Sequence, residues 1–272
     1  MYNYDGFCNI CNKNVIYTSA NDWYRDYLRC PLCSSMVRQR ALIFVLQNEL
    51  KIDIDKMVIH ESSPSHIIPI LQNNTKYCYS HYFEKVKSGE YYNNCLCVDL
   101  MNIPFKNNYF DLFITFDVFE HLFDPMKVIN EIYRVLNDDG IYIMTFPMES
   151  GFKPTEKACV LENNKPIFIE TDRSKLKHLT DVEYHGNPVS NKGCVVTYYY
   201  GYDILNIIEK ESKFKCDIFF HNKDIEKYGI MGVYNEVIVC YKNKNRQCMN
   251  ERPTVENITE CKKKFYANCE AL

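Results

Sequence analysis

The sequence predicts an α/β protein built on a doubly wound, largely parallel sheet, with a small Cys-rich segment in front of it. Short apolar runs alternate with helical or long connecting segments over residues 57–147. The alternation resumes over residues 202–241, after a polar insertion at 148–200. Strands spaced in this way favour a parallel sheet whose two faces are both covered. A strand pair at the end of the chain completes such a sheet.

The individual elements follow from local patterns. Residues 36–50 have apolar residues at helical spacing, with Ser34 or Ser35 as the cap. Residues 125–137 form a second amphipathic helix, which Asp124 and Pro125 begin. A further helix is expected near 202–212, and strands are expected at 57–61, 76–80, 95–100, 111–116, 141–147, 215–220 and 236–241.

The composition limits the class of protein. The chain has 272 residues, of which 46% are hydrophobic, enough for one well-filled core with additions. The net charge of −3 makes nucleic acid an unexpected partner, because phosphate binding usually requires a basic surplus. No apolar run is long enough for a membrane span, and the N-terminus does not resemble a secretory signal. We therefore expect a cytoplasmic protein; the sequence gives no indication of oligomeric state.

The chain divides into three parts. Residues 1–35 form the Cys-rich segment, and residues 36–242 form the α/β domain with its insertion at 148–200. Residues 243–272 form a polar tail without a recognisable motif.

Two Cys-x2-Cys pairs in the first segment predict a zinc site. Cys8 and Cys11 form one pair, and Cys30 and Cys33 form the other, with residues 12–29 between them. Each pair presents two thiolates, and two pairs complete a tetrahedral Zn²⁺ shell. Four protein ligands leave no open position, so we interpret the site as structural, a small zinc ribbon.

The purpose of the ribbon has two interpretations. It fastens the helix at 36–50 onto the sheet, or it forms part of a substrate wall. Arg38 and Arg40 follow the second pair directly. An exposed basic face is the expectation for them, and an anion contact is the alternative.

Titratable residues follow the apolar run at 111–116. Asp117, Glu120 and His121 come at or just after the end of this expected strand. In an open α/β sheet, ligands bind outside the carboxyl ends of the strands. These side chains are therefore predicted to line the ligand crevice.

Residues 110–147, FDLFITFDVFEHLFDPMKVINEIYRVLNDDGIYIMTFP, together with MVIHESS and Asp99-Leu100, resemble class I S-adenosylmethionine-dependent methyltransferases. The CPxCxS and YHGNP segments are similar to a bacterial subgroup that is often associated with surface-glycan or secondary-metabolite pathways. The resemblance implies a Rossmann-like sheet, S-adenosylmethionine as the cofactor, and a methyl acceptor that is a small molecule or a sugar, which points to polysaccharide biosynthesis.

The resemblance also implies roles for single residues at the first and third strands. Glu61 matches the acid near the methionine end of the cofactor. Ser62 and Ser63 form the turn that usually carries a glycine-rich motif, so the loop departs from the family pattern. Asp99, followed by Leu100, matches the position that faces the adenine amino group.

Two further positions carry over. The second strand usually ends in an acid that binds the ribose hydroxyls, but this sequence has Ser80 and His81 there, with Glu84 as another candidate. Asp117 matches the residue that borders both cofactor and acceptor.

His121 and His185 are the candidate catalytic bases. An imidazole near an acceptor hydroxyl can accept its proton, because its pKa lies near working pH. The alternative is structural: Glu120 caps the next helix, His121 forms a buried hydrogen bond, and His185 belongs to a turn near Gly186.

Three functions remain open. The first is methylation of a small molecule or glycan, at oxygen. The second is methylation of RNA or protein, with the zinc ribbon as the recognition module. The third is a zinc-stabilised binding protein without catalysis, which the altered SSPS loop favours.

Overall fold

The computed structural model describes residues 2–148, 154–187, 190–220, 223–243 and 245. The predicted polar tail lies outside the described residues, apart from 243 and 245. Within the described part of the chain, no helix is long and apolar enough to cross a membrane.

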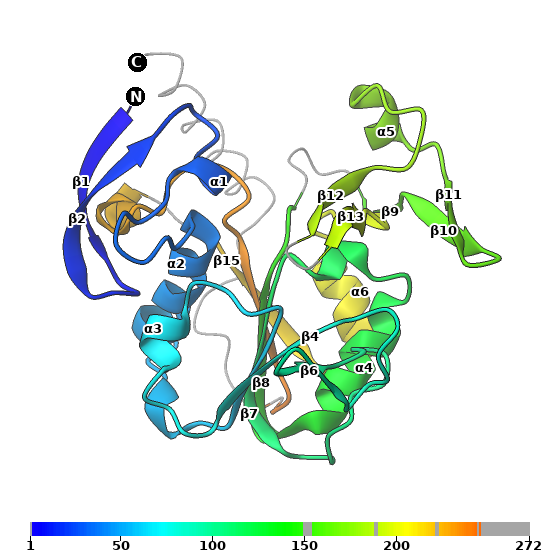
Figure 1. The fold of residues 1–272 in the computed structure, drawn as a ribbon, viewed down its shortest axis with the longest axis horizontal. Helices are drawn as coiled ribbons and strands as arrows, with labels where there is room; N and C mark the ends of the chain where they lie inside the picture. The colour runs from blue at the N-terminus through cyan, green and yellow to red at the C-terminus, as the bar shows by residue number, and fades with distance from the viewer. Residues whose placement is uncertain (1, 149–153, 188–189, 221–222, 244, 246–272) are drawn as a thin grey trace.

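An eight-stranded sheet forms the centre of the molecule, in the order β15-β16-β8-β7-β3-β4-β6-β5 (Figure 1). β3, β4, β6, β7 and β8 are mutually parallel, and β16 runs antiparallel to β8. The predicted parallel sheet with a closing strand pair is therefore confirmed. Its strands are β3 (Ile59–Ser62), β4 (Tyr77–His81), β5 (Tyr91–Tyr92), β6 (Cys95–Cys97), β7 (Phe110–Phe116), β8 (Leu136–Thr145), β15 (Lys215–Phe219) and β16 (Val237–Tyr241).

Helices cover both faces of the sheet (Figure 1). One face carries α2 (Val37–Phe44), its π-helical continuation η1 (Val45–Glu49) and α3 (Ile68–Leu71). The other face carries α4 (Pro125–Val135) and α6 (Ile204–Glu211). Short 3-10 turns are η2 (Ile54–Lys56), η3 (Phe119–His121) and η4 (Lys223–Tyr228).

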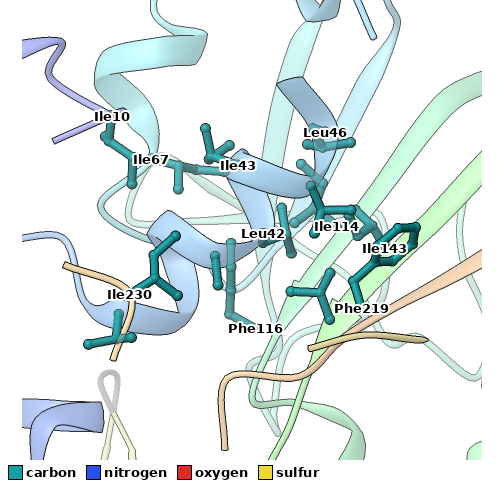
Figure 2. Close-up of a cluster of buried hydrophobic side chains, with 14 of the residues drawn as sticks. Ile10, Leu42, Ile43, Leu46, Ile67, Ile114, Phe116, Ile143, Phe219 and Ile230 are labelled. Carbon is teal, nitrogen blue, oxygen red and sulfur yellow. The ribbon is translucent and has the colours of Figure 1, made fainter. Parts of the chain in front are cut away.

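Each face of the sheet has its own apolar core. Along β7, Leu112 and Ile114 belong to the core under α2, whereas Phe113 belongs to the core under α4. This alternation follows from the two-residue period of a strand. Figure 2 shows the first core, in which Leu42 of α2 lies toward Ile114 of β7, and Ile43 lies toward Ile67.

The N-terminal segment is more regular than its sequence suggested. β1 (Tyr2–Cys8) and β2 (Lys13–Ser19) form an antiparallel hairpin, and α1 (Tyr24–Tyr27) follows. Arg40 of α2 is fully buried against this segment, where its guanidinium stacks 4.5 Å from the Tyr17 ring centroid and donates to the Leu28 and Gly229 carbonyls. The expectation of an exposed basic face was wrong, because these backbone oxygens replace water around the charge.

The insertion forms small antiparallel pairs at the carboxyl end of the sheet (Figure 1). Its elements are β9 (Glu156–Lys157), β10 (Cys159–Glu162), β11 (Lys165–Phe168), α5 (Asp172–Leu176), β12 (Tyr184–Asn187), β13 (Ser190–Val195) and β14 (Tyr198–Tyr199). The backbone of Thr197 donates to the Glu120 carbonyl, 2.8 Å away, and so joins the insertion to the turn after β7.

Candidate functional site

The cysteines of the N-terminal segment lie together. The Cys8 and Cys33 sulfurs are 3.7 Å apart, as are those of Cys11 and Cys30, and all four lie within 4.8 Å of one another. A tetrahedral Zn²⁺ with Zn–S bonds of about 2.3 Å places its sulfurs about 3.8 Å apart. The donor set and the spacing therefore fit a zinc ion.

A pocket of about 1000 Å³ opens at the carboxyl ends of β3, β7 and β8. Several distant parts of the sequence line the pocket: the segment from α1 into α2, the turns after β3, β7 and β8, the insertion, and Tyr234. Figure 1 shows α1 and the β12–β13 hairpin on opposite sides of this end of the sheet. Its charged or histidine lining comprises Arg25, Asp26, Arg29, Arg38, His66, Asp117, Glu120, His121, Lys177, Glu183 and His185.

Asp117 joins the N-terminal segment to the sheet. Its carboxylate lies 2.7 Å from Nη2 of Arg25 and 2.6 Å from Nε of Arg38. The Arg25 side chain is only 5% exposed and that of Arg38 12%. Asp117 has φ 51°, the left-handed conformation that Asp tolerates better than most residues, and its N–H donates to the Thr145 carbonyl.

Glu120 and His121 follow in the turn η3. Nδ1 of His121 lies 2.7 Å from the Val195 carbonyl oxygen, which can only accept, so Nδ1 carries the proton and Nε2 is free of it in the neutral ring. Burial lowers the pKa of His121, which favours that neutral form. Burial, together with the charge of Asp117, raises the pKa of Glu120 to about 8.

The structural alternative, in which Glu120 caps the next helix, is wrong. The cap of α4 is Asp124, whose side chain accepts from the Lys127 N–H. Glu120 is instead 3% exposed, and its Oε1 lies 3.7 Å from Nε2 of His121. Glu120 belongs to η3, which ends before α4 begins, and its carboxylate lies within 4.8 Å of ring nitrogens of His121 and His185.

His185 reaches the same place from β12. Its ring centroid lies 5.2 Å from that of His121, with the two rings nearly perpendicular. Its Nε2 lies 3.6 Å from Oε1 of Glu183. Contact with His185, followed by Lys177 and Tyr199, lowers the pKa of Glu183 to about 2. The structure thus brings together the two histidines that the sequence proposed as bases.

The predicted cofactor residues lie along one edge of the sheet. Ser63 follows β3, lines the pocket and has φ 63°, a conformation typical of glycine. Glu61 is fully buried and accepts from the Ser65 N–H at 2.8 Å and the Tyr77 hydroxyl at 2.5 Å. Burial raises the pKa of Glu61. Its buried carboxyl group therefore stabilises the turn after β3 by accepting a hydrogen bond from the backbone of Ser65.

The remaining predicted cofactor positions end β3 and β4 or follow β6. Ser62 ends β3 and is 6% exposed, and Ser80 is buried next to His81, the last residue of β4. Asp99 follows β6, and its carboxylate accepts the Met101 N–H at 2.9 Å; Leu100 is buried beside it. The structure places these groups at neighbouring carboxyl ends, as a shared ligand would require.

Sequence reasoning missed Arg25 and Glu183. Arg25 stands in the segment assigned to zinc, and no local pattern relates it to Asp117. Glu183 had a detectable signal, because it lies two residues before His185 and side chains two apart share one face of an extended chain.

The comparisons with known proteins agree with the resemblance. Residues 71–144 match the family model described as a methyltransferase domain. An uncharacterised protein of Methanocaldococcus jannaschii is 39% identical over 49 residues, which cover 18% of this chain and 21% of that relative. The matched part is thus about a fifth of the relative's length.

Two of the solved structures that the chain is similar to are methyltransferases by their descriptions. One is an S-adenosylmethionine-dependent methyltransferase from Mesorhizobium loti, with 12% identity, a TM-score of 0.47, and coverage of 76% of this chain and 98% of that one. The other is 1,6-didemethyltoxoflavin-N1-methyltransferase from Burkholderia thailandensis, with 10% identity, a TM-score of 0.45, and coverage of 76% and 79%.

Proposed function

We propose that this chain is a class I S-adenosylmethionine-dependent methyltransferase that methylates an oxygen of a small-molecule or sugar acceptor. The match of residues 71–144 to a methyltransferase domain and the strand order of the central sheet support this proposal. In this reaction the bond between sulfur and the methyl carbon breaks, and a carbon–oxygen bond forms. The acceptor hydroxyl loses its proton. The cofactor supplies the activated methyl group when it is bound, so the protein must align the acceptor, exclude water and remove the proton.

The observation that carries the proposal is the fixed tautomer of His121. The Val195 carbonyl holds the proton on Nδ1 and leaves Nε2 able to accept one. His121 lines the pocket at the exit of β7. A neutral imidazole with a free Nε2 is suited to take the hydroxyl proton of an acceptor.

The insertion supports a small acceptor. His185, Tyr198 and Tyr199 of the insertion all line the pocket. A pocket of about 1000 Å³ suits ligands of small-molecule size, and aromatic rings offer a face on which a sugar can pack. His185 is a second base or a hydrogen-bond partner of the acceptor.

The cofactor is assigned to the neighbouring strand ends. Ser62 and Ser63 would approach its methionine part, and the φ of 63° at Ser63 supports the view that this turn replaces the usual glycine. Glu61 would act from beneath the turn. Ser80 or His81 would face the ribose, and Asp99 with Leu100 would face the adenine. Asp117 would border both ligands.

The cysteine cluster is assigned to a structural zinc ion. Ser35 contacts Cys8 and Cys33 through its hydroxyl, and its carbonyl accepts from Arg40. These contacts support the interpretation that the ribbon fastens α2 to the rest of the chain. They favour a structural role over a module for recognising RNA or protein.

Binding calorimetry tests the proposal. Wild type, Asp99→Ala and the exposed control Asp138→Ala would each be titrated with S-adenosylmethionine and S-adenosylhomocysteine. We expect wild type and control to bind both, and Asp99→Ala to bind at least 10-fold more weakly. A folded, zinc-loaded protein that binds neither compound would overturn the enzyme proposal in favour of a scaffold without catalysis.

The acceptor would then be sought among sugar and small-molecule hydroxyl compounds by following formation of S-adenosylhomocysteine. His121→Asn retains a donor for the Val195 carbonyl but has no imidazole. We expect it to bind cofactor normally and to lose at least 100-fold in turnover, within the usual range for general-base catalysis. Undiminished turnover would exclude His121 as the base.

A further inference from the structure

We infer that Glu120, His121 and His185 form a binding site for a divalent transition-metal ion at the acceptor end of the pocket. Each residue offers one ligand atom, and the three atoms all lie within 4.8 Å of one another. Two imidazoles and one carboxylate form a ligand set that suits Zn²⁺, Fe²⁺ and Co²⁺. This site is separate from the cysteine cluster, whose donors are all sulfur.

The carboxylate of Glu120 is buried and lacks hydrogen-bond partners among the described residues. It is 3% exposed, and among the described residues neither of its oxygens has a hydrogen-bond partner. Arg25 and Arg38 line the same pocket, but both pair with Asp117. A buried carboxyl group without a partner is costly, and a bound cation would satisfy it.

Hydrogen bonds to the insertion fix the position of the turn η3, which carries Glu120 and His121. The Glu120 carbonyl accepts from both N–H and Oγ1–H of Thr197, at 2.8 and 2.9 Å. His121 donates through Nδ1 to the Val195 carbonyl. A ligating histidine in metalloproteins usually donates its other ring N–H in this manner, which sets the tautomer and the ring orientation.

The donor atoms of the three residues lie nearly as close together as ligands of one ion. Two donor atoms that share an ion at about 2.1 Å lie about 3.0–3.4 Å apart, depending on the coordination geometry. Nε2 of His121 lies 3.7 Å from Oε1 of Glu120. A shift of a few tenths of an ångström closes that gap. His185 has a side chain that is 36% exposed, so it can move toward the other two.

The role of the ion rests on the proposed function, although its binding does not. Three protein ligands leave open positions, as in catalytic metal sites. Glu120, His121 and His185 would hold the ion, and the ion would supply a positive charge that makes a nearby acceptor hydroxyl more acidic. His121 would act as the base in the metal-free site and as a ligand in the metal-bound site.

Cobalt is the probe for this site. Protein that holds one zinc ion per chain would be titrated with Co²⁺ by calorimetry and visible absorption, with zinc content measured before and after. Co²⁺ on nitrogen and oxygen ligands lacks the intense thiolate charge-transfer band that Co²⁺ in the cysteine cluster would give. His121→Asn, His185→Ala and Glu120→Gln would be compared with His66→Ala, which removes a pocket histidine outside the cluster.

We expect wild type and His66→Ala to bind one Co²⁺ without a thiolate band and without losing zinc. The other three variants should bind it at least 10-fold more weakly. S-adenosylhomocysteine binding, measured on the same samples, reports folding and tests the proposed function separately. If wild type binds no such Co²⁺, or if His185→Ala binds Co²⁺ as tightly as wild type does, the metal site is refuted, even where S-adenosylhomocysteine binds.

Discussion

The contact of Asp117 with Arg25 and Arg38 should be one of the main stabilising links between the N-terminal segment and the sheet. Asp117→Asn removes the negative charge but keeps the size of the side chain. Arg25, 5% exposed, and Arg38, 12% exposed, then lose their shared counter-ion. The free energy of unfolding should fall, because two largely buried guanidinium groups are left without adequate charge compensation.

The magnitude follows from the burial. Removing one partner of a fully buried ion pair costs about 3–5 kcal/mol. The Asp117 side chain is 22% exposed, and Asp26 remains 3.1 Å from Arg38, so part of the loss is recovered. We therefore expect a loss of about 2–3 kcal/mol, which corresponds to a melting temperature lower by roughly 5–10 °C for a domain of this size.

Urea unfolding without cofactor measures this loss. The control is Asp138→Asn at an exposed position, which should change stability by less than about 0.5 kcal/mol. Combining Asp117→Asn with Arg38→Met should give a coupling energy of about 1–2 kcal/mol. A loss no larger than that of the control, or no coupling, would refute the reasoning.

Other contacts give further predictions. Arg134 holds the pKa of Glu131 below its ordinary value of 4.5, so wild type should lose stability as pH falls below about 4.5. In a plot of the urea midpoint against pH, Glu131→Gln should reduce the slope below pH 4.5. Burial raises the pKa of Glu61 above 4.5, so stability should decline as pH rises from there through the raised pKa, and Glu61→Gln should remove the decline. Cys11→Ser should lose one zinc ion per chain and have a lower melting temperature, whereas Cys95→Ser should retain the zinc ion. Elemental analysis measures the zinc content of each variant, and calorimetry measures its melting temperature.

Local patterns were sufficient for every strand of the central sheet except β5, which was not expected, and for part of the site. The apolar run of β7 and the polar residues after it, Asp117, Glu120 and His121, were sufficient to predict that the pocket lies at the carboxyl end of this strand. Both features can be read from the order of residues along the chain. The helix expected at 125–137 ends earlier, at Val135, since Leu136 already pairs with Phe110 in the sheet. Pairing with a distant strand overrode the local helical pattern there.

Contacts between distant residues could not be read from the sequence. Arg40 was expected on the surface because charged residues usually are, and its burial is made tolerable by the carbonyls of Ser35, Leu28, Tyr228 and Gly229, which all accept from its guanidinium. The approach of His185 to His121 depends on how the β12–β13 pair lies over η3. No periodicity encodes such a contact.

The cysteine cluster and the pocket are physically connected, so the proposed zinc ion would be linked to the chemistry of the pocket. The cluster reaches α2 through Ser35, and Arg38 in the first turn of α2 pairs with Asp117 at the exit of β7. Arg25, also from the ribbon segment, pairs with the same carboxylate. Loss of the proposed zinc ion should therefore loosen both arginines and their contact with Asp117. Ligand binding in the pocket should then weaken, although none of the described residues that line the pocket is a cysteine.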